Sequence, residues 1–399
     1  MKTNSLLLVV VLGGCVEKLP GEVTGTQSLR VEVTNPTNPG GPGKTERLMD
    51  SQRMVTMNVT ALGPDGAIDT GFTKSVQVYS QYLGTLTPSL GDTPLATFRL
   101  TNGVAMNQSI TLPATFGPTT IWIDDGQSAE PTYATGTSAT LWYRDPFIAD
   151  LQKPADEMVN DALARSPLET KQVTVAGSRY GANGRLSVSS TFAQGYTLSD
   201  VRCAANGAPP CTAQGYDHVM VFSFSAPRDQ RGRLLEVGQV IDGFSGGVSE
   251  FNGLTEIGFP STVAPEMLDN NPARLPAPVV LDPMWFGPVS DPLGRINFEK
   301  NEAAPIAIVN AAVCELDDDF ETYKQWKLDP AGVGGDCSNI DNLINVITSG
   351  VVSDLDMATL ASLEGKVVPR IVGVLRPVSI GSFNVWIIYP RSPADVTLP

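Results

Sequence analysis

Histidine-dependent chemistry could occur at one place in this chain, because His218 is its only histidine. A Ser-His-Asp or Cys-His site would have to be built around it. Strand-like alternation in 216–222 places His218 on the same face as Met220 and Phe222. A single imidazole also lacks the partners found in most zinc, copper and non-haem iron sites. We therefore expect a structural role for His218 and predict no catalytic residue.

Acidic side chains make calcium the best metal candidate. Asp317, Asp318 and Asp319 lie with Glu315 and Glu321 in one short segment, and calcium takes about six to eight oxygen ligands. The segment lacks the Asp-x-Asp-x-Asp-Gly spacing of a calcium loop, and an acidic run is also typical of a solvated surface. The three aspartates are therefore candidate calcium ligands, and the sequence predicts no other cofactor.

Three arginines are the candidate ligand-binding residues. Arg228, Arg231 and Arg233 cluster near Phe224, and grooves that bind single-stranded nucleic acid combine such cations with aromatic rings. The net charge of −15 and the excess of acidic residues in the C-terminal quarter of the chain oppose binding to phosphates. Nucleic acid is therefore disfavoured as a partner, and a protein or glycan is expected instead.

The N-terminus carries a signature of export. An apolar run, 6–12, follows a basic residue, and two glycines stand directly before Cys15. The run is too short to span a bilayer and fits a cleaved signal peptide, 1–14. The alternative is an ordinary secretory signal with a chance cysteine.

This pattern resembles the lipobox of bacterial lipoproteins. The resemblance implies that Cys15 carries acyl chains, palmitate among them, and anchors the protein to a membrane. Val16 stands where an aspartate would be the inner-membrane retention signal. In a host with two membranes, the resemblance therefore implies an outer-membrane lipoprotein.

The remaining cysteines fit an oxidising compartment. Besides Cys15 the chain has Cys203, Cys211, Cys314 and Cys337, an even number that is typical of disulfides in exported proteins. Their spacing pairs neighbours, Cys203 with Cys211 and Cys314 with Cys337. A four-cysteine zinc site is a poorer interpretation, because neither pair has the CxxC spacing that zinc sites favour.

Composition and alternation predict an all-β fold. Glycine (38) and proline (31) are abundant, and short alternating segments are separated by turn signals. After a flexible tether, 15–27, the segment 28–147 resembles the Ig-like modules of exported bacterial proteins, which implies a β-sandwich. We interpret 148–169 as a linker with a short helix in 155–163, which begins near Pro154.

Two further segments predict OB-like barrels. The strand pattern of 170–263 looks like a Greek-key barrel of the OB type, and 301–399 repeats its order after a Pro-rich connector, 264–300. Within the repeat, a similar short segment precedes Gly243 in one copy and Gly373 in the other. The end of the chain, 390–396, also resembles OB-like modules attached to secreted bacterial nucleases, and the sequence indicates no counterpart of their nuclease domain.

The sequence therefore predicts a non-catalytic, lipid-anchored envelope protein that acts in binding or scaffolding. The fold alone does not determine what it binds. The alternative is an extracellular enzyme, or an accessory module of one, that acts on nucleic acid or polysaccharide.

Overall fold

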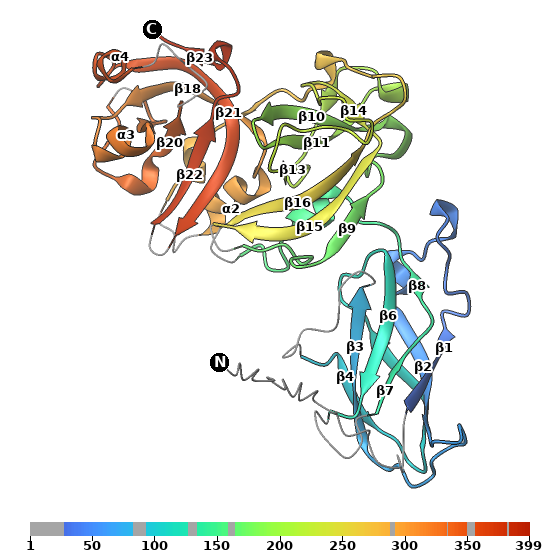
Figure 1. Cartoon of the computed structure of the whole chain (residues 1–399). Helices are drawn as coiled ribbons and strands as arrows, with labels where there is room; N and C mark the ends of the chain where they lie inside the picture. The colour runs from blue at the N-terminus through green and yellow to red at the C-terminus, as the bar shows by residue number, and fades with distance from the viewer. Residues whose placement is uncertain are drawn as a thin grey trace, which may run out of the picture.

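The computed structural model describes residues 28–82, 93–126, 134–158, 164–287, 292–332, 334–348, 356–380 and 383–399. The expected signal peptide, Cys15 and the tether lie outside these residues. Within the described part, three β-rich units follow one another along the chain (Figure 1), and the all-β fold class is confirmed. None of the helices in that part has the length and apolar character needed to cross a membrane.

The first unit is a β-sandwich. One sheet has the strand order β1-β2-β5, and the other has the order β4-β3-β6-β7 with β8 paired to β6. Val55 and Met57 of β2 share one buried core with Ile121 and Ile123 of β6. This is an Ig-like sandwich whose fourth strand joins the second sheet. The strands are β1 (Ser28–Asn35), β2 (Met54–Leu62), β3 (Ser75–Tyr82), β4 (Ala96–Arg99), β5 (Val104–Thr111), β6 (Pro118–Asp124), β7 (Thr135–Thr137) and β8 (Leu141–Trp142).

The second unit is a barrel with the strand order β10-β11-β13-β16-β15-β9. β13 and β16 run parallel, and the other neighbours in this path run antiparallel. With β9 and β10 taken as halves of one first strand, the order is that of an OB barrel. The strands are β9 (Gln172–Val175), β10 (Gly184–Phe192), β11 (Gly195–Cys203), β12 (Cys211–Thr212), β13 (His218–Phe222), β14 (Val240–Ile241), β15 (Gly243–Phe251) and β16 (Leu254–Val263).

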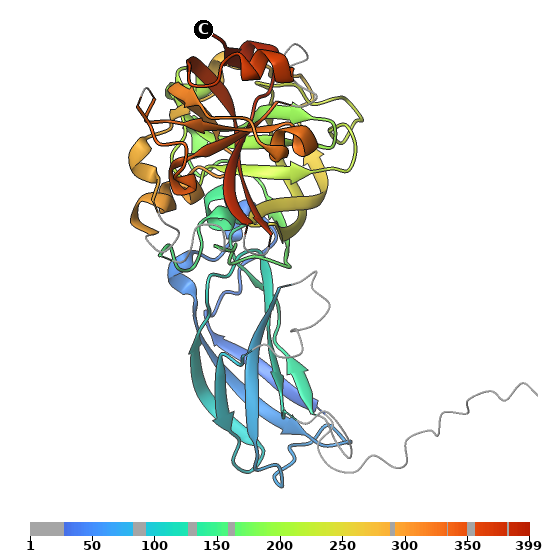
Figure 2. The ribbon, with the colours of Figure 1, turned by 90° about the vertical axis from the view of Figure 1, so that its left-hand side faces the viewer.

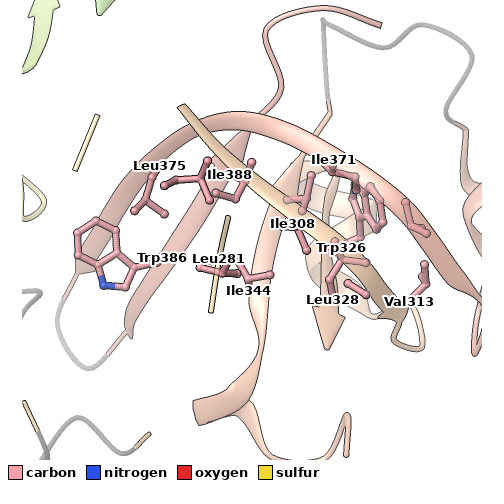
Figure 3. Packing of buried hydrophobic residues seen from close by; sticks show 14 of the residues in the cluster. Leu281, Ile308, Val313, Trp326, Leu328, Ile344, Ile371, Leu375, Trp386 and Ile388 are labelled. Atoms are coloured by element: carbon pink, nitrogen blue, oxygen red, sulfur yellow. The ribbon is translucent and has the colours of Figure 1, made fainter. Parts of the chain in front are cut away.

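The third unit repeats this topology. Its order is β18-β19-β20-β22-β21, and β21 returns to pair with β18. β20 and β22 are the parallel pair. Trp326, Trp386, Ile371 and Ile388 fill the barrel core (Figure 3). The strands are β17 (Val279–Val280), β18 (Pro305–Val313), β19 (Gln325–Asp329), β20 (Ile344–Ile347), β21 (Val367–Ile380), β22 (Phe383–Tyr389) and β23 (Val396–Thr397).

A glycine in the fourth strand of each barrel permits a close approach of backbones. A Cβ on Gly243 would lie 2.4 Å from the carbonyl oxygen of Val175, and one on Gly373 would lie 2.6 Å from that of Tyr389. A larger residue would push the neighbouring strands apart. The two glycines that align in the sequence repeat therefore both allow a close backbone approach, Gly243 to β9 and Gly373 to β22.

Arg144 joins the sandwich to the linker. Its guanidinium donates to Asp50 in the sandwich at 2.9 Å and to Asp150 of α1 (Ile148–Gln152) at 2.7 Å. It also lies over Phe116, a sandwich residue that packs into the core of the first barrel. The first two units are therefore joined by packed side chains as well as by the chain.

The segments between the units differ in detail from expectation. The linker helix is α1, ahead of Pro154, because a proline disfavours helical backbone in the residue before it. Residues 155–158 are not helical, and 159–163 lie outside the described residues. In the Pro-rich connector, β17 pairs with β18, and α2 (Pro292–Lys300) places Phe298 in the third unit's core. The other helices are α3 (Asp318–Tyr323) and α4 (Met357–Ala361).

Both predicted disulfides are present. Cys203–Cys211 links β11 to β12, and Cys314–Cys337 links the end of β18 to the loop after β19.

Removing Cys314–Cys337 should destabilise the protein more than removing Cys203–Cys211. The bridged cysteines are 23 and 8 residues apart, so loop-closure entropy predicts losses of about 3.5 and about 2.5 kcal/mol. Urea denaturation of the two double serine variants measures both values. Equal or reversed losses would contradict this explanation.

Candidate ligand-binding site

The two barrels meet where β21 passes the turns of the first barrel (Figure 1). The Ser379 amide donates to the Asn252 carbonyl at 2.7 Å, and the Arg391 guanidinium approaches the Ser189 carbonyl. These contacts lie at the β15–β16 turn and beside the β10–β11 turn. In an OB barrel, the loops between strands 1 and 2 and between strands 4 and 5 border the ligand surface. The third unit therefore packs against the edge of that surface.

A buried segment, 299–303, is hydrogen-bonded to both barrels. The Glu302 carboxyl accepts from the Thr255 amide of β16 at 3.0 Å. The Lys300 carbonyl accepts from the Tyr216 amide at 2.7 Å, and the Ala303 amide donates to the Leu375 carbonyl of β21 at 2.9 Å. This segment therefore fixes one barrel relative to the other.

Burial raises the pKa of Glu302 well above its usual range, and the charges of Glu299 and Glu250 raise it further. Hydrogen bonds from Thr255 and Gln152 oppose that rise. One carboxyl oxygen, Oε2, is buried without a hydrogen-bond partner in the described part of the chain. The junction thus favours an uncharged carboxyl group.

A cleft of about 510 Å³, here called the inter-barrel cleft, opens at this junction. One wall is residues 190–193, where β10 turns toward β11. The other wall combines Arg376 of β21 with residues 389–393, which follow β22. Ser190 and Ser392 also line the cleft, and the Ser190 hydroxyl is hydrogen-bonded to that of Thr197 at 2.7 Å. The volume lies in the range of small-molecule sites, about 300–1,000 Å³.

Arg376 spans the inter-barrel cleft. Its guanidinium carbon lies 4.7 Å from the ring centre of Phe192 in the first barrel and 4.6 Å from that of Tyr389 in the second. Nε is buried and has no hydrogen-bond partner among the described residues. Burial lowers the pKa of Arg376, while Tyr389 and Glu256 oppose that effect. Arginine nevertheless stays charged in proteins, so the cleft contains a partly desolvated cation.

The second arginine of the cleft already has a counter-ion. Arg391 donates to both carboxylate oxygens of Asp395, at 3.0 and 2.8 Å. Glu256 attracts Arg376 at longer range, but within the described residues no ion pair involves Arg376. A planar guanidinium of this kind suits a carboxylate, which it can bind with two parallel hydrogen bonds.

Three phenylalanines near the cleft are here called the aromatic row: Phe222, Phe224 and Phe259. Gly195, at the turn after Phe192, pairs with Phe222. The ring centres of Phe222 and Phe224 are 4.6 Å apart, and those of Phe224 and Phe259 are 4.9 Å apart. Phe224 is 54% exposed and Phe259 81%, and both have positive φ angles, 58° and 50°. Bulky residues rarely adopt this backbone region, and such strain is concentrated at functional sites.

The arginines singled out in the sequence have structural partners instead. Arg233 Nε donates to Asp229 Oδ2 at 2.6 Å, and its other nitrogens donate to the carbonyls of 265 and 266. Arg231 donates to the Ala264 carbonyl and Arg228 to the Gly232 carbonyl. They hold the loop after β13 against the chain that follows β16.

The candidate calcium ligands also have local roles. Asp317 caps α3 by accepting from the Asp319 amide at 3.1 Å. Lys327 forms ion pairs with Asp317 and Asp319, while Asp318 is exposed in the first turn of α3. Among the described residues, no group of three or more histidine, cysteine or acidic side chains is placed to hold a metal. Calcium therefore stays an untested prediction.

His218 is 2% exposed. Its Nδ1 lies 2.8 Å from the Ser199 hydroxyl, and its carbonyl accepts from Gln152 at 2.5 Å. Burial lowers the pKa of His218 to about 3, so the ring is neutral at ordinary pH. A Gly-x-Ser-x-Gly string at 243–247, which the sequence interpretation overlooked, lies in β15 between β9 and β16. It is not the strand-to-helix turn that exposes a nucleophilic serine.

The sequence interpretation did not select Arg376, Phe192 or Tyr389. One feature of the sequence could have pointed to Arg376, because it is the only charged residue in 371–390. Its position opposite Phe192 depends on how the barrels dock, which alternation within one strand does not reveal.

Comparison of the chain with protein-family models, with curated proteins and with solved structures gives no match.

The carboxyl group of Glu302 should make stability fall as pH rises. Because its pKa is raised in the folded state, its stabilising effect is complete below the unfolded pKa and is lost as pH rises through the folded pKa. Glu302→Gln keeps a neutral side chain and should flatten the decline in unfolding free energy as pH rises above the usual glutamate pKa of about 4.3. Urea denaturation across this range measures the decline. Exposed Glu321→Gln is the control, and an unchanged decline in Glu302→Gln would refute the assignment.

Proposed function

We propose that this chain is a non-catalytic, lipid-anchored protein of the cell envelope, and that it binds a ligand between its two OB-like barrels. The observation that carries the proposal is the inter-barrel cleft. Both barrels supply its walls, and Arg376 lies in it with no ion-pair partner among the described residues. The burial of His218, the chain's only histidine, favours binding over histidine-dependent catalysis.

The sandwich supports a role in presenting the barrels away from the membrane. It begins at Ser28, shortly after Cys15 in the sequence, and the two barrels follow it along the chain and lie together beyond one end of it (Figure 2). Arg144 and Phe116 tie it to α1 and to the first barrel. Such a spacer would hold the cleft in a defined orientation. The two disulfides agree with an exported location.

Anchoring should depend on Cys15. In a bacterial host, the wild-type chain should incorporate labelled palmitate and remain with the membranes, whereas Cys15→Ser should do neither, because the acyl chains supply the membrane affinity. The Cys203→Ser/Cys211→Ser variant, which loses cysteines elsewhere, is the control and should be labelled normally. Intact mass spectrometry of the membrane fraction measures the acyl chains directly. An unlabelled, soluble wild-type chain would refute anchoring.

A further inference from the structure

We infer that the inter-barrel cleft and the aromatic row together bind an acidic oligosaccharide, with a sugar carboxylate on Arg376 and sugar rings on Phe224 and Phe259. The inference specifies the ligand class for the site of the proposed function and rests on that proposal.

The surroundings of the Arg376 guanidinium indicate that the ligand carries a carboxylate. The guanidinium lies between the rings of Phe192 and Tyr389, and its Nε is without a hydrogen-bond partner among the described residues. A partly desolvated guanidinium gains more from a carboxylate than a hydrated one does, because the local dielectric is low. Arg391 and Asp395 add no net charge, and Glu256 attracts Arg376 only at longer range, so the cleft can pair one acidic group of a ligand.

The sugar rings are assigned from the aromatic row. Phe224 and Phe259 offer flat, exposed faces at the end of β13 and within β16. Such faces stack on nucleobases or on the apolar faces of sugars. Affinity for nucleic acid depends on several Lys and Arg that neutralise successive phosphates, whereas the lining of the cleft offers Arg376 and an Arg391 already paired with Asp395, which favours the sugar. OB barrels are known to accept oligosaccharides as well as oligonucleotides.

The two parts of the site belong to one surface. Met220 points outward from β13 and packs with Phe192, Leu254 and Ala303 at the barrel junction. Phe222 is two residues further along the same strand and therefore lies on the same face. A chain-like ligand can thus extend from Arg376 over Phe192 to the aromatic row. A short peptide with a free carboxyl end would use Arg376 and leave the row unused.

Calorimetry on the full chain, purified from membranes in detergent, tests the inference with tetragalacturonate and its methyl ester. The ester keeps the rings and removes the charges. The acid should bind, and the ester should bind about tenfold or more weakly, because a charged hydrogen bond to Arg376 is lost. Arg376→Gln should weaken acid binding by about tenfold to a hundredfold. Arg370→Gln, exposed on the same strand, is the matched control and should bind normally.

Two further variants separate binding from folding. Arg376→Lys keeps the charge but loses the planar fork, and should fall between the wild type and Arg376→Gln. Phe224→Ala/Phe259→Ala removes exposed rings, so it should fold normally, and it should weaken acid and ester binding alike.

Equal binding of acid and ester, or undiminished binding by Arg376→Gln, would overturn the inference. Absence of tetragalacturonate binding would also overturn it, whereas the anchoring part of the proposed function would be judged separately by palmitate labelling. Binding of trialanine in preference to both sugars, and loss of that binding with the trialanine amide, would assign the cleft to peptide ends instead.

Discussion

The docking of the two barrels is the constraint on which the candidate site depends. Segment 299–303 donates and accepts backbone hydrogen bonds across the junction, and Glu302 is buried against Thr255. Neither barrel alone forms the inter-barrel cleft, because its walls come from β10 on one side and from β21 and the chain after β22 on the other. A small movement between the barrels would separate Phe192 from Arg376, so the proposed binding would depend on how the barrels dock.

The sandwich is also joined to the first barrel by side-chain contacts. Arg144 is paired with Asp50 and Asp150, and Gln152 at the end of α1 donates to the carbonyl of His218 in the first barrel. A path of hydrogen bonds and ion pairs therefore runs from the sandwich through α1 to the first barrel, and segment 299–303 continues it to the second. The chain is organised as joined units rather than as domains on flexible linkers.

Local patterns predicted the fold class well. Alternation found most sandwich strands, and the aligned glycines Gly243 and Gly373 pointed to two barrels with one topology. Several strands were not predicted, among them β5, β11, β15 and β20. β5 contains Asn107 with a positive φ, at an irregularity of its register with β2. β11 is almost wholly buried yet includes Ser199 and Asp200, which are hydrogen-bonded to His218 and to the Arg179 amide. Buried polar residues of this kind hide a strand from any pattern of hydrophobicity.

The candidate site was harder to predict for a different reason. Arg228, Arg231 and Arg233 form a visible cluster, but each is hydrogen-bonded within its own loop or to the chain that follows β16. Arg376 is isolated in the sequence. It became a candidate because its guanidinium lies over Phe192, which belongs to the other barrel. A cluster along the chain indicates shared local structure, whereas a ligand site at a domain junction is assembled from residues far apart in sequence.

Hydrogen exchange with and without tetragalacturonate would test the central claim most directly, because it reports both walls of the inter-barrel cleft at once. The account predicts slower exchange in 190–195 of the first barrel and, in the same complex, in 374–378 and 389–393 of the second. Protection confined to one barrel, or protection elsewhere with both walls unchanged, would contradict it.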